Sequence, residues 1–294
     1  MRRQGHFMAL AMTGALLTGC AVEGDAPLAA DEVPLPVVTG ANASSGPESL
    51  VGSWTLAGVG EKGTGTILRL ASHDLYVFGS RCGTLSGSWQ ADVDGVFVAK
   101  IFGAPTATQG IRGCERASEQ TPRWLRRVVA YRFDGRVVVL LDGLGQPVAR
   151  LIPGATPTPV PELATTEVEP AVVTEQFRRA VAPAAELPAT LIPADRQRLM
   201  GRWIPVDGHR AAYVEFAADG EWRASDGCND QDGRWVSAPR GTLLGVAGPV
   251  TLAACDNVPV ASWLWTVRRA GFDGEILVLL DARAVETGRL RRVD

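Results

Sequence analysis

The sequence lacks several features that would point to common classes of protein. It has no run of about 20 apolar residues, the length that a bilayer-spanning helix needs. It has only three histidines and no Cys-x-x-Cys or Gly-x-Ser-x-Gly motif, so neither a zinc site nor a serine hydrolase is indicated. Its formal charge is −3, which argues against electrostatic binding of nucleic acid. We therefore predict no catalytic residue, no metal site, no cofactor and no nucleic-acid partner.

The first 20 residues are typical of an export signal. Arg2 and Arg3 precede an apolar run over residues 7–17, and the stretch Leu-Thr-Gly-Cys ends at Cys20. As a helix this run would be only about 17 Å long, too short to span a bilayer. The stretch resembles the lipobox of bacterial lipoproteins, in which the chain is cut before a cysteine that carries acyl chains. We expect a lipoprotein signal peptide over residues 1–19 and lipidation of Cys20; the alternative is a secreted protein with an incidental cysteine.

Acyl chains on Cys20, such as palmitate, would attach the protein to membrane lipid on the extracytoplasmic face of the cell membrane. Residues 20–46, rich in Ala, Pro, Gly and Ser, predict a flexible tether. Loss of Arg2 and Arg3 with the signal peptide would leave 27 basic residues against 32 acidic ones, a formal charge of −5.

The rest of the chain contains one pattern twice, in the same order. The matching pairs are Gly52-Ser53-Trp54 with Gly201-Arg202-Trp203, Cys82 with Cys228, Gly87-Ser88-Trp89 with Gly233-Arg234-Trp235, Cys114 with Cys255, Trp124-Leu125 with Trp263-Leu264, and Phe133-Asp134-Gly135 with Phe272-Asp273-Gly274. The offset between partners falls from 149 through 146 and 141 to 139 residues, as small deletions in the second copy would produce. Each copy has a usual domain size of about 100 residues. We predict one domain over 47–152, a linker rich in Pro, Ala, Thr and Glu over 153–194, and a second domain over 195–294.

Within each copy the main signal is strands bounded by Asp-Gly turns, because Asp-Gly tolerates the positive φ angles of tight hairpins. These turns fall at Asp94-Gly95, Asp134-Gly135, Asp219-Gly220 and Asp273-Gly274. The clearest strands cover residues 137–141 and 275–280, and the stretch at residues 213–216 should pair with Trp222 across the turn at Asp219-Gly220. The predicted fold class is mainly β (α+β), with two tandem small domains, each a curled antiparallel sheet with one short helix.

The short helix of each copy is predicted from apolar spacing. In the first copy Thr121 would cap it and Pro122 would occupy its first turn. The residues expected on its buried face are Trp124, Leu125 and Val128, repeated in the second copy as Trp263, Leu264 and Val267. A further short helix after Thr174, inside the linker, would bury Phe177 and Val181.

Apart from Cys20, four cysteines lie in a chain expected outside the cytoplasm, where thiols commonly oxidise. Four cysteines allow three pairings. The repeat selects one, because each copy holds two cysteines at equivalent places: Cys82 with Cys114, and Cys228 with Cys255. In the chain-entropy model a closed loop of about 30 residues stabilises a domain by roughly 3 to 4 kcal/mol. The alternative is four buried thiols that act as small apolar side chains.

The second copy resembles a known family. Gly227-Cys228-Asn229 is followed by Thr-Leu-Ala-Ala-Cys at residues 251–255, by an aromatic helix and by the hairpin at residues 272–280. This order resembles the META domain, the HslJ-like family of bacterial envelope proteins, over about residues 199–292. The first copy departs from it with Arg81-Cys82-Gly83, so its assignment depends on the internal repeat. The resemblance implies a small β-rich fold with one helix and an envelope or stress-related role, without an established catalytic site.

Two further motifs have plainer interpretations. Residues 58–63 match Gly-x-Gly-x-x-Gly, but a dinucleotide site needs a helix after this motif, and here a strand is expected, so we predict a hairpin loop. Asp226, Asp230 and Asp232 hint at calcium, but Cys228 takes the first ligand position of the cation loop and a proline takes the twelfth. A solvated turn is therefore favoured.

Trp222 and Trp265 differ from the other six tryptophans, because neither has a tryptophan partner in the other copy. If they were exposed they could contact a ligand or a protein, since aromatic anchors carry much of the energy of interfaces. Additional core packing is the favoured alternative.

The predicted anchor and tandem domains, without a catalytic motif, indicate a non-enzymatic envelope lipoprotein that binds an envelope protein or a small ligand, or supports stress tolerance. The alternative is a cell-wall or extracellular enzyme or inhibitor that uses a cleft between the domains. Such a protein would need a concave pocket with carboxylates from both copies.

Overall fold

The structure, a computed structural model, describes residues 46–59, 65–104, 114, 121–208, 211–251, 253 and 257–293. The predicted signal peptide and Cys20 lie outside the described residues, as does the predicted tether except its last residue. All the described residues belong to one compact unit, which contains both sheets described below. In the described part of the chain, no helix is long and apolar enough to cross a membrane.

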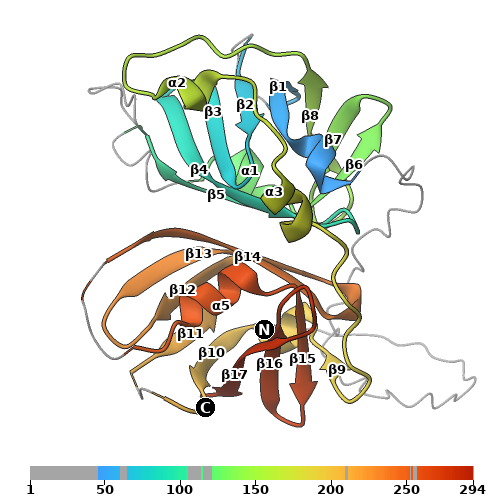
Figure 1. Cartoon of the computed structure of the whole chain (residues 1–294), viewed down its shortest axis with the longest axis vertical. Helices are drawn as coiled ribbons and strands as arrows, with labels where there is room; N and C mark the ends of the chain where they lie inside the picture. Colours follow the sequence, from blue (N-terminus) through green and yellow to red (C-terminus); the bar gives the residue numbers. More distant parts are fainter. Residues whose placement is uncertain are drawn as a thin grey trace, which may run out of the picture. The chain divides into compact units, whose positions relative to one another are not determined.

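The first of two antiparallel sheets has eight strands in the order β5-β4-β3-β2-β1-β8-β7-β6 (Figure 1). Its strands are β1 (Gly52–Ala57), β2 (Ile67–Leu70), β3 (Asp74–Ser80), β4 (Gly83–Ala91), β5 (Phe97–Gly103), β6 (Ala130–Asp134), β7 (Val137–Leu141) and β8 (Pro147–Pro153). The 3-10 helix η1 (Pro47–Leu50) precedes β1, and helix α1 (Arg123–Arg127) precedes β6. A bridge between Val96 and Ala130 joins the two edges, so the sheet is strongly curled.

The second sheet has nine strands in the order β14-β13-β12-β11-β10-β17-β16-β15-β9. Its strands are β9 (Ile192–Pro193), β10 (Gly201–Pro205), β11 (Tyr213–Phe216), β12 (Glu221–Ser225), β13 (Asp230–Ala238), β14 (Thr242–Val250), β15 (Arg269–Asp273), β16 (Ile276–Leu280) and β17 (Glu286–Arg292). The helices are α4 (Arg196–Leu199), the 3-10 helix η2 (Pro239–Gly241) and α5 (Val260–Thr266). Pairing of Thr242 in β14 with Arg269 in β15 closes this sheet on itself.

The two sheets have the same strand order, with β10 to β17 corresponding to β1 to β8. Equivalent details recur inside them. The indole Nε1 of Trp54 donates to Leu50 O at 2.8 Å, and that of Trp203 donates to Leu199 O at 2.7 Å. In each copy one short helix precedes the last three strands in the chain: α1 comes before β6 to β8, and α5 comes before β15 to β17. The predicted fold class is therefore confirmed.

The local signals predicted the hairpins and the helix faces correctly. The glycines of the four Asp-Gly turns have φ between 59° and 85°. Phe216 pairs with Trp222 across the turn at Asp219-Gly220. On the helices, Leu125, Val128, Leu264 and Val267 are at most 1% exposed, while the two equivalent tryptophans are partly buried against the cores.

Thr121 does not cap α1, so this prediction is wrong. The N-cap is Pro122, and the helix begins at Arg123. The Thr121 hydroxyl instead accepts a hydrogen bond from Ile101 N at 3.0 Å. Ile101 lies in β5, and a partner 20 residues earlier in the chain cannot be recognised from the local pattern around Thr121.

The segment between the two sheets packs on the first sheet. It contains α2 (Thr165–Val168) and α3 (Glu175–Ala180). The helix predicted after Thr174 is confirmed: the Thr174 hydroxyl accepts from Phe177 N, and Phe177 and Val181 enter the first core at 2% and 8% exposure. Buried Arg69 holds α2 in place by donating to Thr166 O and Glu169 O, each at 3.0 Å.

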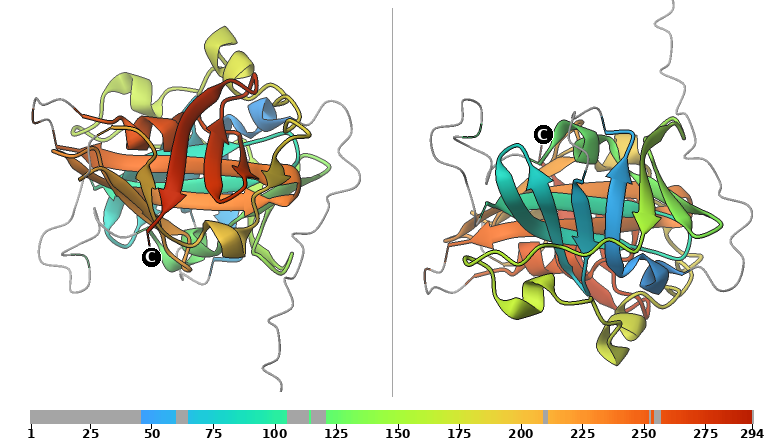
Figure 2. Two further views of the ribbon diagram at one scale, coloured as in Figure 1. Left: turned by 90° about the horizontal axis from the view of Figure 1, so that it is seen from below. Right: turned by 90° about the horizontal axis from the view of Figure 1, so that it is seen from above.

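The outer faces of β4 and β5 pack against those of β13 and β14 (Figure 2). An apolar cluster fills the contact, with the buried residues Val96, Val98, Val236, Leu244 and Val246 at its centre. Because β13 and β14 are the equivalents of β4 and β5, the same face of each copy is used. This is the isologous arrangement found at two-fold symmetric interfaces, here within one chain.

Hydrogen bonds across this contact are reciprocal. Gln90 of β4 donates from Nε2 to Trp265 O, in the last turn of α5, at 2.9 Å. Arg234 of β13 donates to Leu125 O at 3.3 Å and Arg126 O at 2.6 Å, in the last turn of α1. Each sheet therefore satisfies carbonyl groups at the end of the other sheet's helix.

Candidate functional site

A cavity of about 300 Å³ opens at one end of the first sheet, beside the disulfide between Cys82 and Cys114. Its apolar wall includes Val77 of β3, Leu85 of β4 and Trp124 of α1. Ligand cavities in proteins begin at about this volume and are mostly apolar with a few polar groups. The cavity is therefore the candidate functional site of the first copy.

The disulfide and a tight turn hold one wall of the cavity. Cys82 and Cys114 are bonded across a separation of 32 residues, which confirms the pairing predicted from the repeat. The Ser80 hydroxyl accepts from Cys82 N at 3.2 Å and donates to Gly83 O. Gly83 has a φ of 88°, in the left-handed region that favours glycine.

The polar part of the wall is basic. Arg81, Arg123 and Arg126 line the cavity, all three are exposed at its rim, and no aspartate or glutamate is among its described lining residues. The remaining polar lining comes from hydroxyl groups, including those of Ser80 and Thr121. The arrangement can attract an anion while its wall accommodates an apolar body.

The second sheet has an asparagine side chain at the corresponding turn. Asn229, which follows Cys228 as Gly83 follows Cys82, is 5% exposed. Its Oδ1 accepts from Ala253 N at 2.6 Å and from the Thr251 hydroxyl at 3.1 Å, and its Nδ2 donates to Ala253 O at 3.0 Å. Asn229 thereby ties the segment after β14 to the β12–β13 turn. Gly83 has no side chain with which to make these bonds.

Asp226 and Asn229 together form a hydrogen-bonded clamp at the β12–β13 turn. The Asp226 carboxylate accepts from Cys228 N at 2.8 Å and Asn229 N at 2.6 Å, and also from the side-chain amides of Asn229 and Asn257. Burial by itself would raise the pKa of Asp226, but these hydrogen bonds outweigh it and hold the pKa at about 2. The clamp is therefore charged throughout the physiological pH range.

The helix tryptophans also differ between the copies. Trp263 packs so closely over Gly288 of β17 that a Cβ there would lie 2.3 Å from the indole ring. The first sheet has Ala149 at the same register position, opposite Leu140 as Gly288 is opposite Leu279. The methyl group of Ala149 excludes the same packing, and Trp124 lines the cavity.

The remaining predicted cysteines are described only in part. Cys228 is disulfide-bonded, but Cys255 lies outside the described residues, so its pairing with Cys228 stays a prediction. Cys20 also lies outside them.

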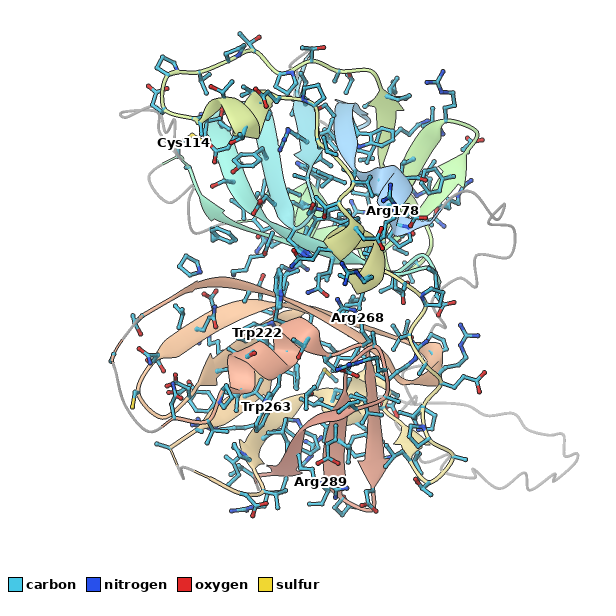
Figure 3. The ribbon with its side chains drawn as sticks, in the orientation of Figure 1. Cys114, Arg178, Trp222, Trp263, Arg268 and Arg289 are labelled. Atoms are coloured by element: carbon cyan, nitrogen blue, oxygen red, sulfur yellow. A yellow bond between two sulfur atoms is a disulfide. The ribbon has the colours of Figure 1, made fainter. Side chains whose placement is uncertain are left out.

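Neither Trp222 nor Trp265 lines the cavity. Trp222 is 1% exposed inside the second sheet (Figure 3), and its Nε1 donates to Arg234 O and Val246 O at 3.2 and 3.1 Å. The core alternative therefore applies to Trp222. Trp265 is half-buried in the contact between the sheets, with its ring centroid 5.5 Å from that of His73.

The three aspartates that hinted at calcium do not converge on one point. Asp226 is bound by the clamp, whereas Asp232 pairs with Lys100 of the first sheet at 2.6 Å. Among the described residues no cluster of three or more histidine, cysteine or acidic side chains could hold a metal ion. Asp226 is therefore part of a turn, as favoured above, rather than a calcium ligand.

Comparisons with known proteins add no assignment: no family model, no curated protein and no solved structure matches this chain.

Sequence reasoning did not identify the cavity or its arginines. Arg123 and Arg126 are ordinary exposed residues of a helix in the sequence, and only folding brings them beside Arg81. The available signal was the departure of the first copy from the second, Arg81-Cys82-Gly83 in place of Gly227-Cys228-Asn229. That difference marks the turn at which the cavity opens.

Proposed function

We propose that this protein is a non-enzymatic binding protein of the bacterial cell envelope, anchored to the membrane through acylated Cys20 and built from two META-like modules. In this proposal the first module holds a small ligand in its cavity. The second module, with its clamped end, supports the first through the contact between the sheets.

The observation that carries the binding role is the basic cavity beside Cys82 and Cys114. It combines an apolar wall with arginines at the rim, and the equivalent turn of the second sheet is tied down by Asn229. A duplicated module that keeps its fold but changes this end in only one copy is what a division between binding and support would produce.

The alternative of an enzyme or inhibitor acting in a cleft between the domains is less well supported. Such a site would need carboxylates from both copies that converge on open space. The centre of the contact between the sheets is instead filled by the apolar cluster around Val98 and Leu244. A cavity of about 590 Å³ is lined by residues of both copies, but the carboxylate of Asp94 in its lining pairs with Arg240 at 2.8 Å. At the charged side of the contact, Glu221 and Asp232 pair with Lys100 at 3.3 and 2.6 Å.

The anchor is tested by expressing the full chain and its Cys20→Ala variant in a bacterial host. Wild type is expected to incorporate labelled palmitate and to partition into the detergent phase, and the variant is expected to do neither. Unlabelled wild type in the aqueous phase would refute the anchor.

The binding role is tested by extracting small molecules from the protein purified from its own envelope and identifying them by mass spectrometry. Val59 lines the cavity at its partly exposed rim, so Val59→Trp should block it, whereas Leu144→Trp changes an exposed side chain in a turn of the same sheet. A compound retained by wild type and Leu144→Trp but lost from Val59→Trp is expected. Equal retention by all three proteins would contradict the binding role of the cavity.

A further inference from the structure

The volume of the cavity limits the size of its ligand. A water molecule takes up about 30 Å³ of liquid. The cavity of about 300 Å³ therefore corresponds to roughly ten waters. A small organic molecule therefore matches the cavity in size.

The charge of the rim limits the chemistry of the ligand. Arg123 and Arg126 are exposed on helix α1, and within the described part of the chain neither forms an ion pair with a carboxylate. Arg81 adds a third positive charge to the same lining. A guanidinium group binds a carboxylate or phosphate through two parallel N–H···O bonds, which makes such a rim selective for anions.

The apolar wall limits the chemistry further. An inorganic anion would interact with the arginines but gain nothing from the partly exposed apolar lining at Val59, Pro122 and Trp124. A neutral hydrocarbon would contact that wall but gain nothing from the arginines. A molecule with an apolar body and one anionic end uses both parts of the cavity.

We infer that the first module binds a small amphipathic organic anion, of the class of medium-chain fatty acids, with its carboxylate at Arg123 and Arg126 and its apolar body against Val59, Pro122 and Trp124. This inference rests on the proposed binding function and adds the class of ligand. The carboxylate remains near water at the rim, where the exposed arginines reach it without being buried themselves.

The test uses isothermal titration of the full chain carrying Cys20→Ala, with the disulfides oxidised, against octanoate and against 1-octanol. The two probes share one chain and differ in the anionic group. Octanoate is expected to bind about tenfold more tightly than 1-octanol, and Arg123→Glu/Arg126→Glu should remove this preference. Arg123→Gln/Arg126→Gln on the same helix should weaken octanoate binding in the same direction without adding acidic groups.

The control is Arg136→Glu, an equal change of charge at an exposed residue of the β6–β7 turn, which should leave octanoate binding within about twofold of wild type. Val59→Trp, which blocks the cavity, should abolish binding of both probes.

The inference that the ligand is an anion would be overturned if octanoate and 1-octanol bound with equal affinity and both double variants left that affinity unchanged. The cavity would then still be a binding site. Octanoate binding that survives Val59→Trp would place the ligand elsewhere and overturn the site. No binding of octanoate at all would also overturn the inference. The proposed function would still be judged separately, by the compounds extracted from the purified protein.

Discussion

Arg234 is the residue whose replacement most directly tests the account of the contact between the sheets. Its side chain is 3% exposed, and its guanidinium group pairs with Glu221 at 3.3 Å while donating to Leu125 O and Arg126 O. Burial lowers the pKa of Arg234, and the nearby carboxylate of Glu221 partly offsets this effect. Arg234→Met keeps most of the apolar stem and removes every polar contact.

The expected loss of stability follows from what remains after the substitution. Arg126 O of α1 loses its donor, and a buried unsatisfied group costs about 1 to 3 kcal/mol, whereas Leu125 O keeps the hydrogen bond from Val128 N at 3.2 Å. Glu221 is 29% exposed and keeps Lys100 at 3.3 Å, so its charge adds little. We therefore expect Arg234→Met to lower the free energy of unfolding by about 1 to 3 kcal/mol.

Urea unfolding of the oxidised protein, followed by tryptophan fluorescence, measures this loss. Arg150→Met is the matched control, because Arg150 pairs with Asp134 at 3.2 Å and both side chains are about half exposed. The control should lose less than about 1 kcal/mol. A loss for Arg234→Met no larger than that of the control would refute the argument that the buried guanidinium stabilises the contact.

Three further predictions concern single residues. Burial raises the pKa of Asp92 to about 6 despite the hydrogen bond from Val96 N, so the protein loses stability as the pH rises from about 4 to above 6. In urea unfolding, the free energy of unfolding of Asp92→Asn should equal that of wild type near pH 4 and exceed it at pH 7.5 by at most about 3 kcal/mol. Asn229→Ala should raise the pKa of Asp226 above its value of about 2 and lower the free energy of unfolding by about 2 kcal/mol, and an unchanged carboxyl titration by NMR would contradict the clamp. Gly288→Ala should cost about 1 to 3 kcal/mol and alter the fluorescence of Trp263, whereas an unchanged melting temperature would show that the indole does not occupy this place.

The sequence by itself determined the elements whose causes are local. Asp-Gly turns, alternating strands and the apolar face with Leu264 and Val267 depend on neighbours within a few residues, and they lie where predicted. The helix after Thr174 was predictable for the same reason, since its cap and Phe177 are three residues apart. The repeat carried this further, because two copies with one pattern must have one fold and equivalent cysteines; it predicted the bond between Cys82 and Cys114 before any distance was known.

Tertiary structure alone decided which polar groups meet across long separations. The Thr121 hydroxyl bonds to Ile101, 20 residues away, and Arg234 reaches the carbonyl group of Leu125, 109 residues away. The basic cavity has the same origin, because Arg81 comes from the turn before β4 and Arg123 from a helix some 40 residues later. Hydrogen bonds and ion pairs act over a few ångströms in space, so residue type and sequence spacing cannot specify such partners until packing of the apolar faces has brought them together.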